Sequence, residues 1–372
     1  MQATCQDALD VNRYFNSRAD FFLTMTANPH WPEVKAALLP GQKPEDRPDI
    51  ICRVFHAKRD ELMKDITKNN CFGECIGFSY SNEFQKRGLP HTHSIGYLDP
   101  RSKLRTPEDI DSLLSAEFPD PDTQPELFEL VKKFMVHSPC GIHNPNAPCM
   151  DPQTGKCSKN FPKLFRETTS LSEDSYAVLR CRDTGRTFEI NGKQVDNRWV
   201  VPYSPYLLWK YRCHINVEWI ASIKAIKYIY KYIYKGHDRT TMEFRTCQDE
   251  VRQYLDARYV AQHEAFWRTM AYEMHHISPA VYRLDVHLPG MQNVTWNEDS
   301  ADTMNEIVEQ GAARATTLTA WFKANAESAD ARNVYYQDFP TKFVFSKNKK
   351  KMDSSTAGPR NRSHVLCVSQ GQ

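Results

Sequence analysis

The alternation of hydrophobic and polar residues predicts an antiparallel sheet in the first part of the chain. Three runs, Phe21–Thr26, 76–80 and 91–97, are strand-like, and along a strand the side chains alternate between two faces. The last two are separated by a short stretch with Gly and Pro, which favours a hairpin. Residues 51–69 have apolar residues at helical spacing, so we expect an amphipathic helix beside the sheet.

The later parts of the chain have mixed patterns that complete an α+β fold. Residues 106–136 have helical spacing that prolines interrupt. Residues 188–209 have the pattern of strands around Gly192 that end in proline turns, and residues 248–275 and 301–326 that of polar-faced helices. The interrupting prolines are Pro119, Pro121 and Pro125, and the turn prolines are Pro202 and Pro205.

The predicted hairpin carries two histidines that share one face. His91 and His93 are two residues apart on a strand, so their side chains point the same way. A turn symmetric about Gly88 places Gln85 opposite His91 and Glu83 opposite His93, and puts all four side chains on that face.

Two imidazoles with a carboxylate or amide oxygen form a mixed nitrogen and oxygen donor set. Such a set suits magnesium or manganese, with zinc or nickel as tight-binding substitutes. Glu83 and Gln85 are both candidates for the third ligand, and Glu83 has the stronger charge argument. The plainer alternative is a strand whose two histidines only form a polar surface.

A second segment, residues 224–236, is rich in tyrosine and lysine. As a helix, it forms one basic stripe with Tyr228 and Tyr232 beside it, and Gly236 is a credible end. As a strand, it alternates tyrosine with isoleucine and lysine, and its β-propensity is high. The pattern fits a half-buried aromatic element whose lysines reach the solvent. It also fits a tyrosine nucleophile that lies close to the positive charges of lysines. The lysines of the stripe are Lys224, Lys227, Lys231 and Lys235.

The turn-rich residues 134–165 contain three cysteines and two histidines. Their clustering within about twenty residues, amid Pro, Asn and Gly, suggests a structural zinc knuckle, although the spacing is not one of the strong Cys-x-x-Cys signatures; reduced free thiols are the alternative. The two histidines compete for the fourth ligand position. The candidate ligands are His137, Cys140, His143, Cys149 and Cys157.

Composition limits the classes of protein that fit. Eleven cysteines without a secretory leader predict a reducing compartment, and no apolar run approaches the ~20 residues of a membrane span. With a net charge of +2, DNA contacts must come from local patches rather than from a globally basic surface. Two such patches are the pair Lys86 and Arg87 at the hairpin turn and the lysine stripe that includes Lys224 and Lys227.

Four stretches together carry a family resemblance. Residues 83–93, which end in His91-Thr92-His93, resemble the two-histidine motif of the HUH endonucleases of rolling-circle replication, and more narrowly the Rep domain of Helitron transposases. Residues 228–235 are similar to the two-tyrosine motif of that superfamily, in which tyrosines four apart are each followed three residues later by lysine. Residues 21–29 resemble its first strand motif, and residues 212–219 the stretch upstream of the tyrosines.

The resemblance implies a metal-dependent nickase and strand-transferase of single-stranded DNA at transposon ends. Tyr228 and Tyr232 would be the nucleophiles that form a 5′-phosphotyrosine link, and Lys231 and Lys235 would neutralise phosphate. The implied fold is an HUH core with central histidine strands and a nearby tyrosine helix. A catalytically silent DNA-binding remnant or host-co-opted module is the alternative, and a zinc hydrolase would leave the tyrosine pair unexplained.

The resemblance also sets the expected domains and partners. We expect an HUH core over residues 1–240, a helical extension over 241–345 and a disordered tail over 346–372. The sequence lacks the Gly-x-x-x-x-Gly-Lys-Ser/Thr loop of the helicase that normally follows, which predicts a truncated Helitron protein that needs a helicase in trans. Nuclear localisation is expected from this function, with the basic residues 347–351 as a weak signal.

Overall fold

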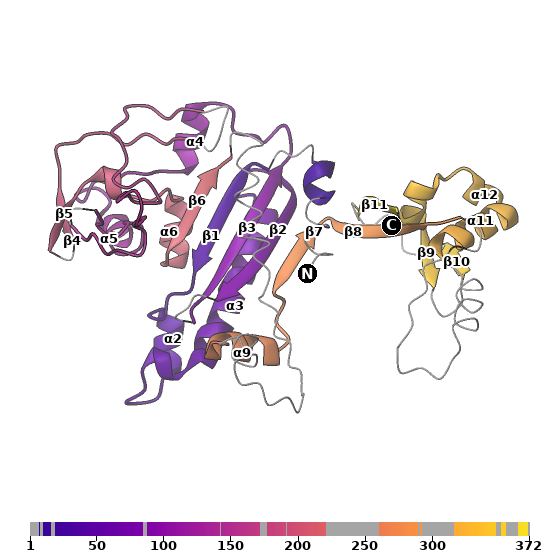
Figure 1. The fold of residues 1–372 in the computed structure, drawn as a ribbon, viewed down its shortest axis with the longest axis horizontal. Coiled ribbons are helices and arrows are strands. Elements are labelled where there is room, and N and C mark those ends of the chain that lie inside the picture. The colour runs from indigo at the N-terminus through magenta and orange to yellow at the C-terminus, as the bar shows by residue number, and fades with distance from the viewer. Residues whose placement is uncertain are drawn as a thin grey trace. The chain divides into compact units, whose positions relative to one another are not determined.

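The computed structural model of the protein describes residues 7, 10–15, 19–84, 88–141, 143–171, 177–190, 192–220, 260–288, 291, 316–346, 351–354 and 364–370. The chain divides into two compact units (Figure 1). One consists of Met1–Cys5 and Phe15–His276, and the other of Gln6–Tyr14 and Ile277–Gln372. The domain boundary predicted near residue 240 lies outside the described residues.

The first unit is built on a five-stranded sheet with the order β6-β1-β3-β2-β7. Strand β1 pairs antiparallel with β3 and β6, and β3 pairs antiparallel with β2, so the expectation of an antiparallel hairpin sheet is confirmed. The strands are β1 (Phe21–Thr26), β2 (Cys75–Phe84), β3 (Pro90–Leu98), β6 (Ile215–Trp219) and β7 (His275–Ser278).

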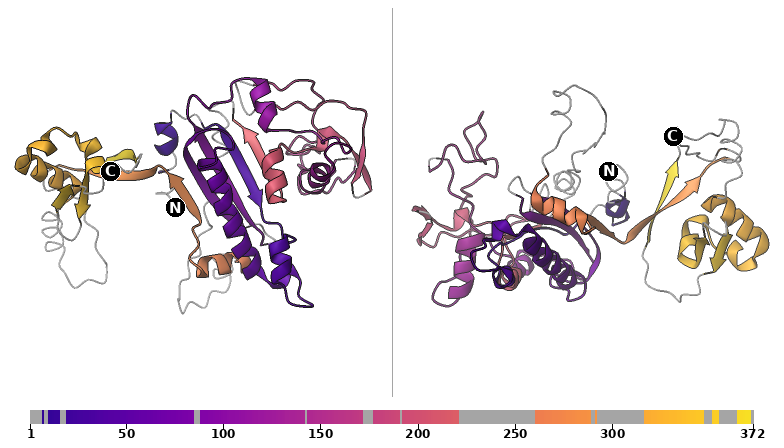
Figure 2. Two further views of the ribbon diagram at one scale, coloured as in Figure 1. Left: turned by 180° about the vertical axis from the view of Figure 1, so that it is seen from behind. Right: turned by 90° about the horizontal axis from the view of Figure 1, so that it is seen from below.

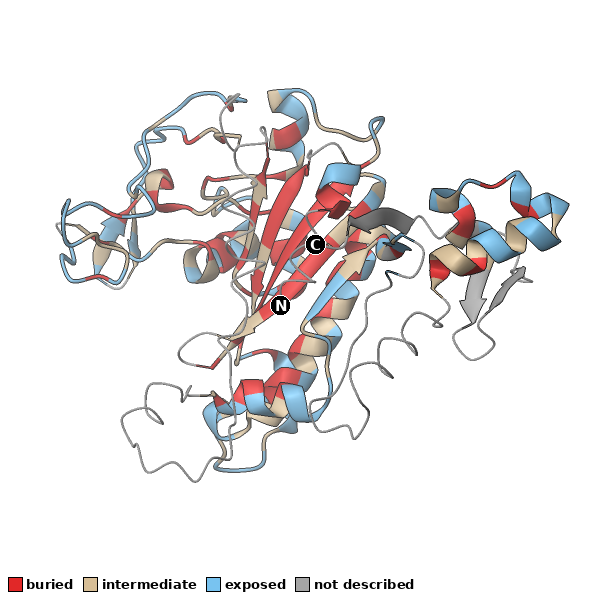
Figure 3. Cartoon of the chain, turned by 45° about the vertical axis from the view of Figure 1, so that its right-hand side comes forward, coloured by how far each residue is buried: buried red, intermediate tan, exposed pale blue. Residues whose placement is uncertain are grey.

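One face of this sheet is apolar and packs on the long helix α3 (Pro48–Thr67) (Figure 2). Leu23 and Met25 of β1 and Ile215 of β6 belong to the same buried cluster as Phe55 of α3. All nine residues of β3 are buried, and Figure 3 shows the central strands as the most buried part of the sheet. Burial of this apolar area fixes which side of each strand faces α3.

The hairpin register differs from the predicted one by two residues. Glu83 is paired with His91 and Ser81 with His93, whereas a turn centred on Gly88 would pair Gln85 with His91. Pairing closes at Phe84 and Pro90, so the five connecting residues are centred on Arg87 instead. A shift of two residues keeps every side chain on its predicted face, so Glu83 and both histidines still share one face.

Prolines begin helices in this fold more often than they end them. Because proline lacks an N–H and has a fixed φ, it fits the first helical position. Pro125 therefore starts α5 (Pro125–Phe134), at the end of the interruption that the prolines predict, whereas Pro205 starts α6 (Pro205–Tyr211), where the sequence wrongly predicts a turn. The same holds for Pro32 in α2 (Pro32–Ala37) and Pro107 in α4 (Pro107–Leu113), and Pro44 opens the 3-10 helix η1 (Pro44–Asp46).

The region after the Cys-rich stretch is only partly a strand region. Strands β4 (Phe188–Ile190) and β5 (Lys193–Val195) form the hairpin expected around Gly192. A short 3-10 helix, η2 (Asn197–Trp199), follows them, and α6 replaces the expected last strand. Of the helix expected over 248–275, the described part contains α9 (Gln262–Thr269) and the start of β7.

The second unit has a small core of its own around Ala320, Ala331, Val334 and Phe339. Strand β11 pairs parallel with β8, and β10 pairs antiparallel with β9. Where a disordered tail was expected, the structure thus contains two short strands, β10 and β11. The elements are β8 (Ala280–Val286), α11 (Thr317–Glu327), α12 (Ala329–Arg332), η4 (Tyr336–Asp338), α13 (Phe339–Lys342), β9 (Phe343–Ser346), β10 (Lys351–Ser354) and β11 (His364–Gln370).

Candidate metal centres on the sheet and in the Cys-rich stretch

The face of the sheet opposite α3 carries the polar side chains of the predicted site. The registers place Thr24 beside His93, Thr26 beside His91, and Glu83 on the other side of His91. Side chains at directly paired positions lie on the same face. Three adjacent strands thus bring together residues that are up to about seventy positions apart in the chain.

Two threonine hydroxyls hold the two imidazole rings. Thr26 Oγ1 lies 2.8 Å from His91 Nδ1, and Thr24 Oγ1 lies 2.9 Å from His93 Nδ1. The two rings are nearly parallel, with centroids 6.4 Å apart. When Nδ1–H donates to the hydroxyl, Nε2 keeps its lone pair, which is the state that a metal ligand requires.

The Nε2 side of the rings meets the carboxylate of Glu83. Glu83 Oε2 lies 3.5 Å from His93 Nε2, while His91 Nε2 and Glu83 Oε1 are buried and have no hydrogen-bond partner among the residues that the structure describes. A Glu83–His93 ion pair alone would leave both of those atoms unsatisfied, which is costly. Two atoms that bind the same cation are about 3 Å apart at the usual bond lengths. The distance between Glu83 Oε2 and His93 Nε2 is close to this value, so both atoms could bind one cation.

The electrostatics favour a neutral His91. Burial lowers the pKa of His91 to about 3, and the neighbouring His93 and His214 lower it further in the same direction. A neutral imidazole binds a cation without first losing a proton. Two neutral imidazoles and one carboxylate fit a divalent cation and leave coordination positions for water or phosphate oxygens.

The second donor group lies in the Cys-rich stretch. One ligand atom from each of His137, Cys140, Cys149 and Cys157 lies within 4.8 Å of the other three, so this cluster can hold a metal ion. His137 Nε2 is 3.7 Å from Cys140 Sγ and 3.6 Å from Cys157 Sγ. Three thiols and one imidazole at these distances match a closed tetrahedral site.

Backbone and aromatic contacts hold this second cluster in place. The His137 ring stacks on Phe161 with centroids 4.3 Å apart, and the His137 N–H donates to the Trp199 carbonyl. The Lys159 N–H donates to Cys157 Sγ at 3.4 Å. His143, the other candidate histidine, is outside the cluster and lies near Trp199, with ring centroids 6.1 Å apart.

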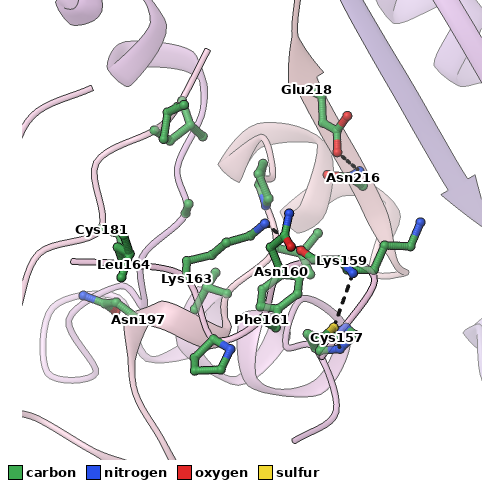
Figure 4. A pocket seen from close by; sticks show the side chains of 18 of the residues that line it. Cys157, Lys159, Asn160, Phe161, Lys163, Leu164, Cys181, Asn197, Asn216 and Glu218 are labelled. Atoms are coloured by element: carbon green, nitrogen blue, oxygen red, sulfur yellow. Dashed lines mark hydrogen bonds between the residues drawn. The ribbon is translucent and has the colours of Figure 1, made fainter. Parts of the chain in front are cut away.

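A large cavity in the first unit lies between the sheet and the Cys-rich stretch. It has a volume of about 1170 Å³ and is lined by Thr24 and His93 from the sheet and by Cys157 from the metal cluster. Asn216 and Glu218 of β6 also line it, and Figure 4 shows them facing the cavity opposite Lys159 and Lys163. The cavity therefore touches both donor groups.

Sequence reasoning missed four of these polar residues, although each lies in a stretch that it had singled out. Thr24 and Thr26 alternate with buried apolar residues on β1, as do Asn216 and Glu218 on β6. Polar side chains at every second position, among apolar ones, indicate a strand with one polar face. That signal identifies the face, but not which other strand lies next to it.

Several predicted site residues lie outside the described part of the chain. These include the whole tyrosine and lysine segment and the tip of the hairpin, and no geometry is assigned to them. They are Lys224, Lys227, Tyr228, Lys231, Tyr232 and Lys235, and Gln85, Lys86 and Arg87.

Comparison with known protein families gives one match. Residues 1–95 match the family model described as the Helitron helicase-like domain at the N-terminus. The match includes β1, β2 and most of β3, with His91, His93 and Glu83. No curated protein matches the chain. Among the described residues, no helix is long and apolar enough to cross a membrane.

Proposed function

We propose that this chain, whose first 95 residues form a Helitron helicase-like N-terminal domain, is a metal-dependent single-stranded DNA endonuclease and strand-transferase of the HUH type. The observation that carries the proposal is the sheet site. Two threonine-held imidazoles and a carboxylate converge there, and His91 Nε2 and Glu83 Oε1 have no hydrogen-bond partner among the described residues. Single-stranded DNA at the ends of a transposable element is the proposed substrate.

The sheet residues would hold a magnesium or manganese ion through His91, His93 and Glu83. Such a cation polarises a phosphate and stabilises the charge that develops on it. Thr24 and Thr26 orient the rings, and burial keeps His91 neutral. Gln85, the other candidate ligand, lies outside the described residues, so the structure supports Glu83 directly and leaves Gln85 as a prediction.

Tyr228 and Tyr232 are the proposed nucleophiles. The phenol oxygen of one tyrosine would attack the phosphorus, forming a phosphotyrosine bond as the bond to the 3′-oxygen breaks. The phenol proton is lost and the leaving 3′-oxygen gains one, so the step exchanges one phosphodiester for another. Lys231 and Lys235 would neutralise the phosphate, and Lys86, Arg87, Lys224 and Lys227 would contact the DNA backbone.

The Cys-rich cluster has a structural role in this proposal. His137, Cys140, Cys149 and Cys157 would bind zinc with all four positions filled by protein, which leaves no open position for a substrate. The ion would hold the turn-rich wall of the cavity in one conformation. Its contribution would be to folding rather than to the chemical step.

The proposal is tested with labelled single-stranded oligonucleotides from the ends of the element that encodes the protein. The purified chain is incubated with manganese or with a chelator and analysed by denaturing electrophoresis. We expect a manganese-dependent band shifted by covalently bound protein, lost when Tyr228 and Tyr232 are both changed to Phe. Tyr230→Phe and Tyr234→Phe are matched controls within the same segment and should keep the band.

The opposite outcome identifies the alternative function. If DNA is retained only under native conditions, with no covalent product in any metal, the chain is a DNA-binding module without nuclease activity. The same result would remove the assignment of the two tyrosines as nucleophiles.

A further inference from the structure

The cavity beside the sheet site contains hydrogen-bond acceptors that the proposed cleavage chemistry does not use. Asn216 Nδ2 donates to Glu218 Oε1 at 3.3 Å, while Asn216 Oδ1 is buried and has no partner in the described part of the chain. Burial raises the pKa of Glu218, and Asn216, Lys163 and Lys159 only partly offset this effect. A ligand that donates hydrogen bonds to both residues would satisfy the amide oxygen and compensate the carboxylate for its burial.

Nearby lysines decide which kind of ligand fits. Lys159 and Lys163 act electrostatically on Glu218, and Lys163 Nζ donates to the Lys159 carbonyl at 2.8 Å. Two cations close to the only carboxylate among the residues that line this cavity disfavour a second metal ion there. They favour a ligand that has an anionic group as well as hydrogen-bond donors, and a nucleotide has both.

The position of the two acceptors relates them to the sheet site. Asn216 pairs with Thr24, and Thr24 pairs with His93, so Asn216 is two strands from His93 on the same face. Two strand spacings are about 10 Å. At about 1170 Å³, the cavity exceeds the usual size of a small-ligand pocket and has room for more than one nucleotide. One bound strand can therefore contact both places.

We propose that Asn216 and Glu218 select guanine in the single strand next to the phosphate held at the sheet site. Guanine is the DNA base whose Watson–Crick edge presents two adjacent donors, N1–H and the N2 amino group. Asn216 Oδ1 and the second oxygen of the Glu218 carboxylate, which does not accept from Asn216, are two neighbouring acceptors. Reading of an unpaired base along this edge is a common mode of single-strand recognition. The inference rests on the proposed function in naming the substrate as single-stranded DNA and in placing one of its phosphates at the sheet site.

The test measures binding of the full chain to short fluorescent single-stranded oligonucleotides by anisotropy, with chelator present so that no cleavage occurs. In the first series, each oligonucleotide is a thymine strand with a single guanine, and the guanine is moved by one position at a time. In the second series, the guanine at the position of tightest binding is replaced by adenine, cytosine or inosine. We expect guanine to bind about tenfold more tightly than adenine or cytosine, as one good bidentate contact would give. Inosine, which lacks only the N2 amino group, should lose part of this preference in the unmodified protein.

Variants assign the preference to the two residues. Glu218→Gln replaces one acceptor oxygen of the carboxylate by an NH2 donor. The affinities for the guanine and adenine strands should then differ by no more than about twofold. Glu189→Gln, a change on β4 outside the cavity lining, should keep the full preference. Three results would each overturn the inference. The unmodified protein could bind strands with all four bases equally, it could bind no strand at all, or the guanine preference could survive Glu218→Gln. A guanine preference in this assay, together with no covalent product in the separate manganese experiment, would contradict only the proposed nuclease function.

Discussion

The two candidate metal centres of this protein are built in opposite ways. In the sheet site, ligands come from paired strands, and threonine hydroxyls hold the two imidazoles without a metal. In the Cys-rich cluster, all four ligands come from residues 137–157, a stretch rich in turns, and three of them are thiols. The first site is formed by the fold, so a cation bound there, as proposed, would be exchangeable and could act on a substrate. The second site would depend on its ion for local folding.

The largest expected effect comes from removing a ligand of the sheet site. His91→Ala should lower the yield of covalent protein–DNA product at least about a hundredfold, because the cation loses a ligand. Zinc content, measured by atomic absorption, should stay unchanged. His143→Ala removes a histidine outside both donor sets and serves as the control. Full cleavage activity in the His91 variant would show that the two sites do not differ in function as described.

The complementary change is in the Cys-rich cluster. Cys157→Ala should abolish bound zinc and lower the midpoint of thermal unfolding by about 5 °C or more, because the remaining ligands lose the ion that links them. Cys75→Ala, at a half-buried cysteine outside the cluster, should keep the zinc. A Cys157 variant with normal stability and normal zinc content would mean that free thiols, and not a metal, occupy this position.

The difference between the sites also explains what the sequence could predict. Two histidines separated by one residue on a strand must share a face, so the sheet site follows from alternation. Their pairing with Glu83 and Ser81 does not, since it depends on where the hairpin closes. The cysteine cluster was predicted because its ligands are close in the chain. The choice of His137 over His143 needed the stacking on Phe161, which only the folded chain shows.

Residues brought in from a distant strand were the hardest to predict. Asn216 and Glu218 enter the cavity because β6 pairs with β1, about 190 residues away in sequence. Alternation on β6 indicates a polar face, but a sequence alone gives no neighbour for it. The prolines show a different limit. Proline is consistent with both a turn and a helix start, so the sequence pattern wrongly predicts a turn at Pro205, which begins α6.

A smaller effect tests the ring orientation in the sheet site. Thr26→Val removes the hydroxyl that holds His91 and keeps the shape of the side chain, so manganese affinity should fall about tenfold by calorimetric titration. Thr92→Val is the matched control on β3, next to His91. Its hydroxyl is buried on the opposite face without a partner among the described residues, and its removal should leave manganese affinity unchanged. Equal effects of the two changes would contradict the positioning role of Thr26.

The smallest effect concerns pH in the protein without metal. The pKa of His91 is about 3 in the folded chain, below the usual value of 6.5, because burial disfavours its charged form. The unfolded chain therefore binds more protons between these values, and this contribution to stability is lost as pH falls from about 6.5 toward 3. His91→Gln should flatten the decline in unfolding free energy below pH 6, measured by urea denaturation. An unchanged slope would show that His91 is not held neutral.

The most direct test of the account is to locate the covalent bond between protein and DNA. The protein is incubated with a single-stranded end of its element in manganese, digested, and analysed by peptide mass spectrometry. We predict a nucleotide attached to Tyr228 or Tyr232, absent in chelator and in His91→Ala. A nucleotide on Tyr230 or Tyr234, or an attachment that persists without the cation, would contradict the claim that the sheet site activates the phosphate for these two tyrosines.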